Sequence, residues 1–110
     1  MDYMDRLRRL AINDERRVDE DLEDLGSNPD NLDLKTLALT RVAALVAVGG
    51  AEPSFGSQTD AAVSSGATPD DIVDVLVGII PVVGLPRVVA AAPKVAMALG
   101  YDLDEALDGA

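Results

Sequence analysis

Five polar side chains in the sequence could together bind a small anion and transfer a proton to it. Ser54 and Gln58 are four residues apart, which places both on one helix face near its N-terminal end, where free N–H groups favour an anion. Glu52 lies two residues before Ser54. In a mostly apolar pocket a carboxyl group can stay protonated and act as an acid. Arg41 and Arg87 are the only arginines beyond the N-terminal segment, and either can hold a carboxylate with two hydrogen bonds.

Each of these side chains also has an ordinary structural interpretation. Ser54 and Gln58 are typical of a polar helix face, and Glu52 is typical of a first-turn charge that complements the helix dipole. Arg87 could instead pair with Asp74 or with another acid across a subunit interface. The residue types alone leave both interpretations open.

The composition excludes several classes of chemistry. The 110 residues contain no Cys and no His, which removes thiolate nucleophiles, Cys-ligated zinc, iron–sulfur clusters and the commonest general base. The runs Asp19-Glu20-Asp21 and Asp70-Asp71 lack the spacing of a calcium loop, so we expect neither a metal nor a cofactor. The formal net charge of -11 would repel a phosphate backbone, so we expect no nucleic-acid partner.

Length and hydropathy predict one soluble domain. Hydrophobic residues make up 48% of the chain, and only Tyr3, Phe55 and Tyr101 are aromatic, so the core must be aliphatic. No apolar run reaches the roughly 20 residues needed to span a bilayer, and no basic segment followed by an apolar one opens the chain. We therefore expect a cytoplasmic protein that does not contact membranes.

Residues 1–26 form a charged segment that we expect to be helical. Its apolar residues recur at helical spacing, at Tyr3, Met4, Leu7, Leu10, Ala11 and again at Val18, Leu22 and Leu25. Nine acids and five bases share these turns, which is typical of a solvated face with ion pairs one turn apart. The functional alternative is an arm that docks onto a partner subunit.

Two helices are expected in the middle of the chain. Asp33 can cap a helix over 34–49, whose stretch 42–48 has no polar side chain. A helix that is apolar all round must be covered all round, and a subunit interface is the natural cover. After Gly49-Gly50 a second helix is expected over 53–65.

The two remaining helices begin at prolines. Thr68-Pro69-Asp70-Asp71 combines a cap, a proline and first-turn carboxylates, so we expect a helix from residue 69 that breaks around 81–86. Pro86 begins the last helix, over 87–99, and Pro93 should kink it and leave the Val89 carbonyl without its donor. Residues 101–110 form an acidic tail. The expected fold class is all-α, with five to six helices.

The stretch 33–100 resembles the carboxymuconolactone decarboxylase family, which includes the alkylhydroperoxidase D-like proteins. The matching residues are Leu32-Asp33-Leu34-Lys35-Thr36, Ala61-Ala62-Val63-Ser64-Ser65-Gly66-Ala67-Thr68-Pro69-Asp70-Asp71-Ile72 and Val83-Gly84-Leu85-Pro86-Arg87. The resemblance implies an all-helical subunit that assembles with itself into a homotrimer or homohexamer.

The chemistry of the peroxidase branch of this family does not transfer to the chain. That branch carries a Cys-x-x-Cys-x-x-x-His segment, and the best ungapped match puts Ala51, Ser54 and Gln58 at those three positions. The acidic residue of its proton relay falls on Ala38 or Leu39. Reduction of a peroxide requires an activated thiolate, so the resemblance predicts no functional peroxidase.

The decarboxylase branch needs no thiol, and the resemblance therefore implies a lyase acting on a small carbocyclic acid or lactone. Arg41 and Arg87 would bind the carboxylate, and Glu52, Ser54, Gln58 and Arg87 would serve catalysis. Two alternatives stay open. The chain could be a catalytically silent oligomer that binds a small ligand, or a purely structural subunit that docks through residues 1–25.

Overall fold

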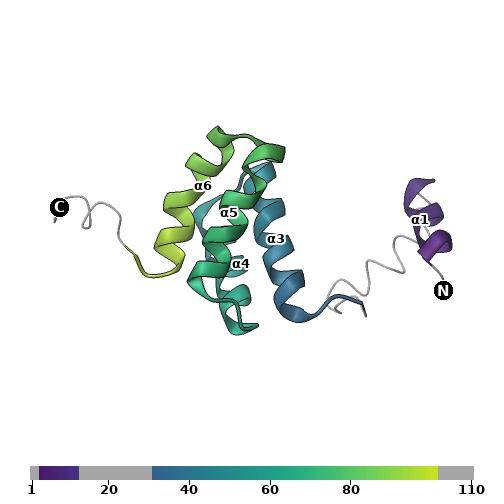
Figure 1. The fold of residues 1–110 in the computed structure, drawn as a ribbon, viewed down its shortest axis with the longest axis horizontal. Coiled ribbons are helices and arrows are strands. Elements are labelled where there is room, and N and C mark those ends of the chain that lie inside the picture. Colours follow the sequence, from purple (N-terminus) through teal and green to yellow (C-terminus); the bar gives the residue numbers. More distant parts are fainter. Residues whose placement is uncertain (1–2, 13–30, 102–110) are drawn as a thin grey trace. The chain divides into compact units, whose positions relative to one another are not determined.

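The computed structural model describes residues 3–12 and 31–101, and all regular structure in these two ranges is helical. The chain divides into two units, Met1–Asn31 and Leu32–Ala110. The first unit contains α1 (Tyr3–Ala11), and the second contains α3 (Leu34–Val48), α4 (Glu52–Ser64), α5 (Pro69–Val83) and α6 (Leu85–Ala98), as Figure 1 shows. The all-α class and five helices are thus confirmed for the described residues. None of these helices has the length and hydropathy that crossing a lipid bilayer requires.

Two predicted features lie outside the described ranges. One is the continuation of the N-terminal helical pattern through Val18, Leu22 and Leu25 to Gly26. The other is the acidic tail from Asp102 onward.

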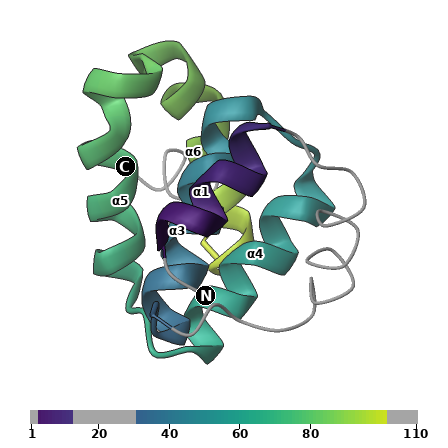
Figure 2. The same cartoon turned by 90° about the vertical axis from the view of Figure 1, so that its right-hand side faces the viewer.

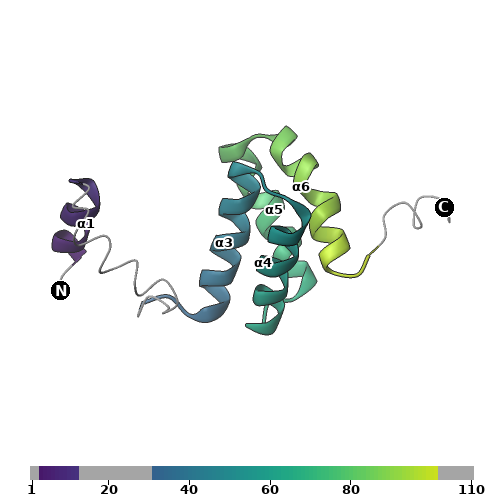
Figure 3. The ribbon, with the colours of Figure 1, turned by 180° about the vertical axis from the view of Figure 1, so that it is seen from behind.

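The second unit is a bundle of four helices built around the α3–α6 pair. Successive helices run in opposite directions, so α3 runs parallel to α5, and α4 runs parallel to α6 (Figure 3). Helix α3 packs against the other three helices, as does α6. Viewed at a right angle to Figure 1, α5 and α4 lie on opposite sides of this pair (Figure 2).

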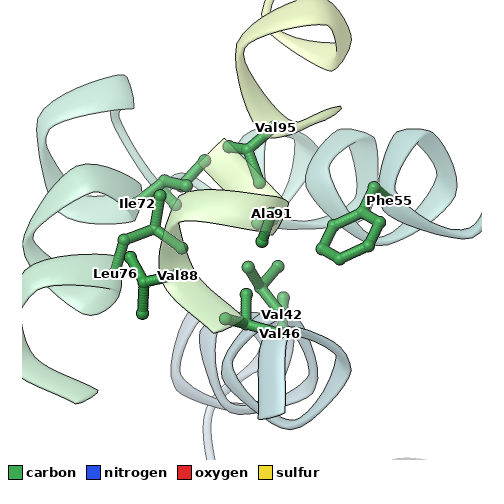
Figure 4. Packing of buried hydrophobic residues seen from close by; sticks show 11 residues of the cluster. Val42, Val46, Phe55, Ile72, Leu76, Val88, Ala91 and Val95 are labelled. Carbon is green, nitrogen blue, oxygen red and sulfur yellow. The ribbon is translucent and has the colours of Figure 1, made fainter. Parts of the chain in front are cut away.

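The core between the helices is aliphatic, as the composition predicts. Phe55 is the one aromatic side chain in it and is 1% exposed. Ala91 of α6 lies near the centre of this core, among valines of α3 and α6 (Figure 4). The buried cluster comprises Ala38, Val42, Val46, Phe55, Ala62, Ala67, Ile72, Leu76, Val88, Ala91 and Val95.

The beginnings of α3 and α5 carry the predicted caps and are joined to each other. Asp33 accepts a hydrogen bond from the Thr36 backbone N–H at 2.6 Å. Thr68 and Asp71 exchange hydrogen bonds of 2.9 and 3.0 Å, the capping box that a Thr followed by an acid three residues later predicts. Lys35 Nζ lies 3.0 Å from Asp71 Oδ2, which links the first turn of α3 to the first turn of α5.

Helix α5 ends at Val83 with Gly84 as its cap, within the break expected around 81–86, and it contains Pro81. A helical proline leaves the carbonyl four residues earlier without its donor, and here that residue is Val77. Val77 is 59% exposed and Pro81 is exposed too, so the interruption falls on the outer side of the helix. The last helix then begins at Leu85, two residues earlier than expected.

The apolar stretch 42–48 is only half covered within one chain. Val42 and Val46 are 1% exposed, whereas Val48 is 72% exposed. The uncovered side is the part for which the sequence predicts a subunit interface, and that prediction stands as a prediction.

Thr59 is the buried side chain that fits its surroundings least well. It is 0% exposed, and its Oγ1 has no hydrogen-bond partner among the described residues. A buried hydroxyl without a partner destabilises a fold by about 1–3 kcal/mol, because its hydration is lost without compensation.

Replacing the Thr59 hydroxyl by a methyl group should therefore stabilise the protein. We expect Thr59→Val to raise the free energy of unfolding by about 1 kcal/mol, measured by urea denaturation. The matched control is the reverse change, Val46→Thr on α3, which should lower it by about 1–3 kcal/mol. A less stable Thr59→Val protein would mean that the hydroxyl has a favourable interaction in the folded state.

The capping box also predicts how stability depends on pH. The Thr68 backbone N–H, followed by the Lys35 ammonium, lowers the pKa of Asp71 below its ordinary value. A group with a lowered folded-state pKa contributes stability above its unfolded pKa and loses it as the pH falls through the folded value. Asp71→Asn should thus be less stable than the wild type at pH 7, and the difference should shrink below about pH 4, the ordinary range of a carboxyl group.

Urea denaturation at a series of pH values measures this difference directly. Asp33 is present in both proteins, so its own titration cancels from the comparison. A difference that stays constant from pH 7 to pH 3 would contradict the assignment.

Candidate functional site

The candidate site lies around the turn that joins α3 to α4. Gly49 ends α3 with φ of +80°, a conformation that glycine adopts without strain, and its N–H donates to the Leu45 carbonyl at 2.8 Å. At Gly50 a Cβ would lie 2.7 Å from a methyl group of Leu45, so the Leu45 side chain would have to shift to admit it. The two glycines let the chain reverse within three residues and begin α4 at Glu52.

Two cations from α6 bind the carbonyl groups of this turn. Arg87 Nη1 donates to the Val48 carbonyl at 3.4 Å, and Lys94 Nζ donates to the Gly50 carbonyl at 2.8 Å. Both come from one side of α6, since seven residues are two helical turns. Figure 3 shows α6 beside this turn. The last carbonyls of a helix carry partial negative charge, so the two cations complement the end of α3.

Lys94 is the residue of the site that sequence reasoning missed. It is half-buried, and its ammonium group lies 5.5 Å from the centre of the Phe55 ring, within the range of a cation–π interaction. Its spacing from Arg87 is the feature of the sequence that could have pointed to Lys94. Arg87 and Lys94 are the only charged side chains of α6, and they stand two turns apart in an otherwise apolar helix.

The structure brings some of the predicted site residues to the turn and leaves one away from it. Glu52 and Ser54 lie in the first turn of α4 and are exposed, and Gln58 follows one turn later, half-buried. Arg87 is bound to the turn. Arg41 lies in α3 two helical turns before Val48, exposed and without a contact to the turn.

No hydrogen bond or ion pair joins any two of these five side chains within residues 31–101. Arg87 binds a backbone carbonyl and forms no ion pair with Asp74 in this chain. The Glu52 side chain is exposed to solvent. It does not lie in an apolar pocket, where a carboxyl group could stay protonated and act as an acid. The site that one chain supplies is therefore an exposed turn with two cations beside it. The first turn of α4, with its free backbone N–H groups, follows directly.

This turn could bind an anion that reaches both cations. An ammonium group has three N–H donors, and Lys94 has one hydrogen bond to a protein acceptor in the described structure. Arg87 has five donors and likewise uses one of them. A carboxylate beside the turn would meet positive charge from α6 and the positive end of the α4 dipole.

The chain belongs to the carboxymuconolactone decarboxylase family, whose model matches residues 16–96. The match includes α3, α4, α5 and nearly all of α6. It supports a protein of the carboxymuconolactone decarboxylase or alkylhydroperoxidase D-like kind. No curated protein and no solved structure matches the chain. Since the sequence contains neither Cys nor His, this member lacks the Cys-x-x-Cys-x-x-x-His segment of the peroxidase branch.

The geometry of the turn predicts a contrast between two glycines. A Cβ at Gly49 would lie 3.0 Å from Arg87 Nη1, on a backbone with positive φ, whereas a Cβ at Gly56 in α4 would meet nothing within 4 Å. We expect Gly49→Ala to lower the free energy of unfolding by about 1–3 kcal/mol, the usual effect of strain at a positive φ. Gly56→Ala should raise it by about 0.5–1 kcal/mol, because alanine favours a helix.

Thermal and urea unfolding of the two variants checks this contrast. Equal effects in the two variants would show that neither the left-handed backbone nor the Arg87 contact matters for stability.

Proposed function

We propose that this protein is a homo-oligomeric member of its family that binds a small carbocyclic acid or lactone beside the α3–α4 turn and acts on it without a thiol. The observation that carries the proposal is the convergence of Arg87 and Lys94 on the carbonyls of that turn, directly before the first turn of α4. The reaction type that this arrangement supports best is a decarboxylation.

Decarboxylation makes three demands on a site. The substrate carboxylate must be held, and Arg87 and Lys94 are the cations nearest the turn. The bond between the carboxyl carbon and the ring then breaks, CO₂ leaves, and the electron pair of the broken bond stays on the ring carbon. The hydroxyl of Ser54 and the amide N–H of Gln58 can stabilise the negative charge that results. A proton must finally reach the carbon, for which Glu52 is the nearest carboxyl group in sequence. Arg41 lies away from the turn within one chain and has no part in these three steps.

Exposure of the site supports assembly with further copies of the chain. Decarboxylation is favoured where water is excluded, yet Arg41, Glu52, Ser54 and Arg87 are all exposed in one chain. Large apolar side chains are uncovered as well, including Val48, Val73, Val77, Val82, Leu85, Val89 and Met97. An interface between copies would cover apolar surface and enclose the turn. A homotrimer or homohexamer follows from the family resemblance.

The alternative is a catalytically silent homo-oligomer that binds a ligand or serves as a structural subunit. Two observations favour it specifically. The cations of the site already bind backbone carbonyls, and no described carboxyl group is placed in an apolar pocket where it would act as an acid. In this alternative Arg87 and Lys94 hold the turn and do nothing else.

A thermal-shift screen against small carboxylic acids and lactones, with product analysis of each hit, tests the proposal. Ligand at about 100 times its Kd should stabilise the wild type by roughly 2.7 kcal/mol. We expect Arg87→Ala to lose most of this shift. The control is Lys35→Gln, which removes a cation at the opposite end of α3 and should keep the ligand-induced shift.

The outcomes separate the candidate functions. A hit that releases CO₂ supports the lyase, and a hit without chemical change supports the silent binding protein. Equal ligand shifts in Arg87→Ala and the wild type would remove Arg87 from the site. No shift with any acid or lactone would leave the structural subunit.

A further inference from the structure

Helix α1 has the composition of a docking element. Its apolar side chains Tyr3, Met4, Leu7 and Leu10 are 60–71% exposed, and no residue of the helix is buried. An isolated helix of 9 residues is marginal in water, so α1 needs a surface against which to fold. The pattern i, i+4, i+7 given by Tyr3, Leu7 and Leu10 is the one with which amphipathic helices bind to a partner.

The charges of α1 are sorted around its circumference. At 100° per residue, the apolar residues occupy one arc, with Arg6 at one border and Arg8 at the other. Asp5 and Arg9 lie on the opposite side and pair with each other at 3.5 Å. The helix therefore presents an apolar stripe between two arginines, in a chain whose net charge is -11.

Among the helices of the second unit, α5 is the one that complements this face. Val73 and Val77 are 49% and 59% exposed, one turn apart on its outer side. Asp70 and Asp74 are exposed beside them, and neither has an ion-pair partner within residues 31–101. We name these four residues of α5 the acidic stripe.

The other helices of the bundle lack this combination. The outer face of α6 carries Val89 and Met97 but no acid. The exposed side of α3 carries Arg41, which would repel Arg6 and Arg8. On α4 the one large apolar side chain that is exposed is Val63.

We propose that α1 of one copy of the chain docks on the acidic stripe of a second copy, with Leu7 against Val77 and with Arg8, at one border of the apolar arc, facing Asp74. Residues 12–33 separate α1 from α3, and a segment of that length spans about 33 Å as a helix and at most about 75 Å when extended, which allows it to reach a neighbouring subunit. The proposal rests on the homo-oligomer of the proposed function and names one of its contacts.

The small size of α1 explains why the contact depends on that oligomer. A stable interface of ordinary size uses about 20–30 residues from each partner, far more than one short helix supplies. Within an assembly held together by other surfaces, however, the arm meets its stripe at a high effective concentration, and a weak contact is then occupied.

The sequence contains no cysteine, so cysteines introduced at two chosen positions can form a disulfide only with each other or with a second copy of themselves. This allows disulfide crosslinking to test the contact in the full-length protein. One preparation carries Leu7→Cys, a second carries Val77→Cys, and the two are mixed, allowed to exchange subunits and oxidised. We expect a disulfide-linked pair of chains, at least tenfold more abundant than in a control mixture of Leu7→Cys with Met97→Cys. Met97 and Val77 are both 59% exposed, so access to the two sites is matched.

Charge reversal tests the role of the arginines in the same mixture. Adding Arg8→Glu to the Leu7→Cys chain should lower the yield of the linked pair severalfold, and adding Asp74→Arg to the Val77→Cys chain should restore it. Raising the salt concentration from about 0.05 to 0.5 M should also lower the wild-type yield, since exposed ion pairs are screened.

Sedimentation of the unoxidised protein distinguishes failure of this contact from failure of the oligomer. If the protein is assembled but the Val77→Cys mixture gives no more disulfide-linked pairs than the Met97→Cys control, α1 does not dock on the acidic stripe. The proposed assembly would then remain intact. A protein that sediments as a monomer overturns both. A chain that carries both Leu7→Cys and Val77→Cys provides a further test. If it forms only the disulfide within one chain, α1 docks on its own chain and the proposal is overturned as well.

Discussion

The bundle depends on how the carbonyl groups at the end of α3 are satisfied. The last carbonyls of any helix have no partner within it, and they accept hydrogen bonds from water or from other parts of the fold. Here the Val48 carbonyl accepts a hydrogen bond from Arg87 of α6, and the Gly50 carbonyl in the following turn accepts one from Lys94 of the same helix. These two hydrogen bonds connect α6 to the turn that precedes α4. Gly49 and Gly50 suit this arrangement, because a Cβ at either position would require the Arg87 or the Leu45 side chain to shift. The end of one helix and the packing of another are thus linked at this turn.

This arrangement has a consequence for the surface. Both charged side chains of α6 are directed to the turn, which leaves its outer face to Val89, Met97 and neighbouring small or apolar residues. Helix α5 and the end of α3 also expose large aliphatic side chains. A bundle of four short helices has too little interior to hold the apolar residues of a chain that is 48% hydrophobic. The self-association proposed above would cover these aliphatic side chains.

How much the sequence predicts depends on whether the responsible residues are close together in the chain. The beginnings of α3 and α5 follow from Asp33 and Thr68, each of which caps residues within three positions, and both are predicted to the residue. For the end of α5 the sequence predicts only the range 81–86, because whether the helix tolerates Pro81 and continues to Val83 depends on which side of the helix faces solvent. The same limit applies to the site. Arg87 and Lys94 bind carbonyls 39 and 44 residues away, and no local pattern specifies those partners. The sequence therefore indicates which residues could act, but only the packing of α6 shows that its lysine belongs with them.

Stability and ligand binding compete at this turn. Because Arg87 and Lys94 already bind the Val48 and Gly50 carbonyls, a carboxylate that draws either cation away must compensate for the hydrogen bond that is lost. Binding beside the existing hydrogen bonds, through the remaining N–H donors, avoids that penalty and restricts the ligand to geometries in which both cations keep their present positions. Affinity would then come from fitting a fixed pair of charges, which favours a compact and rigid acid over a flexible one. A cyclic acid or lactone meets this requirement, and the capping of α3 thereby becomes the source of selectivity at the proposed site.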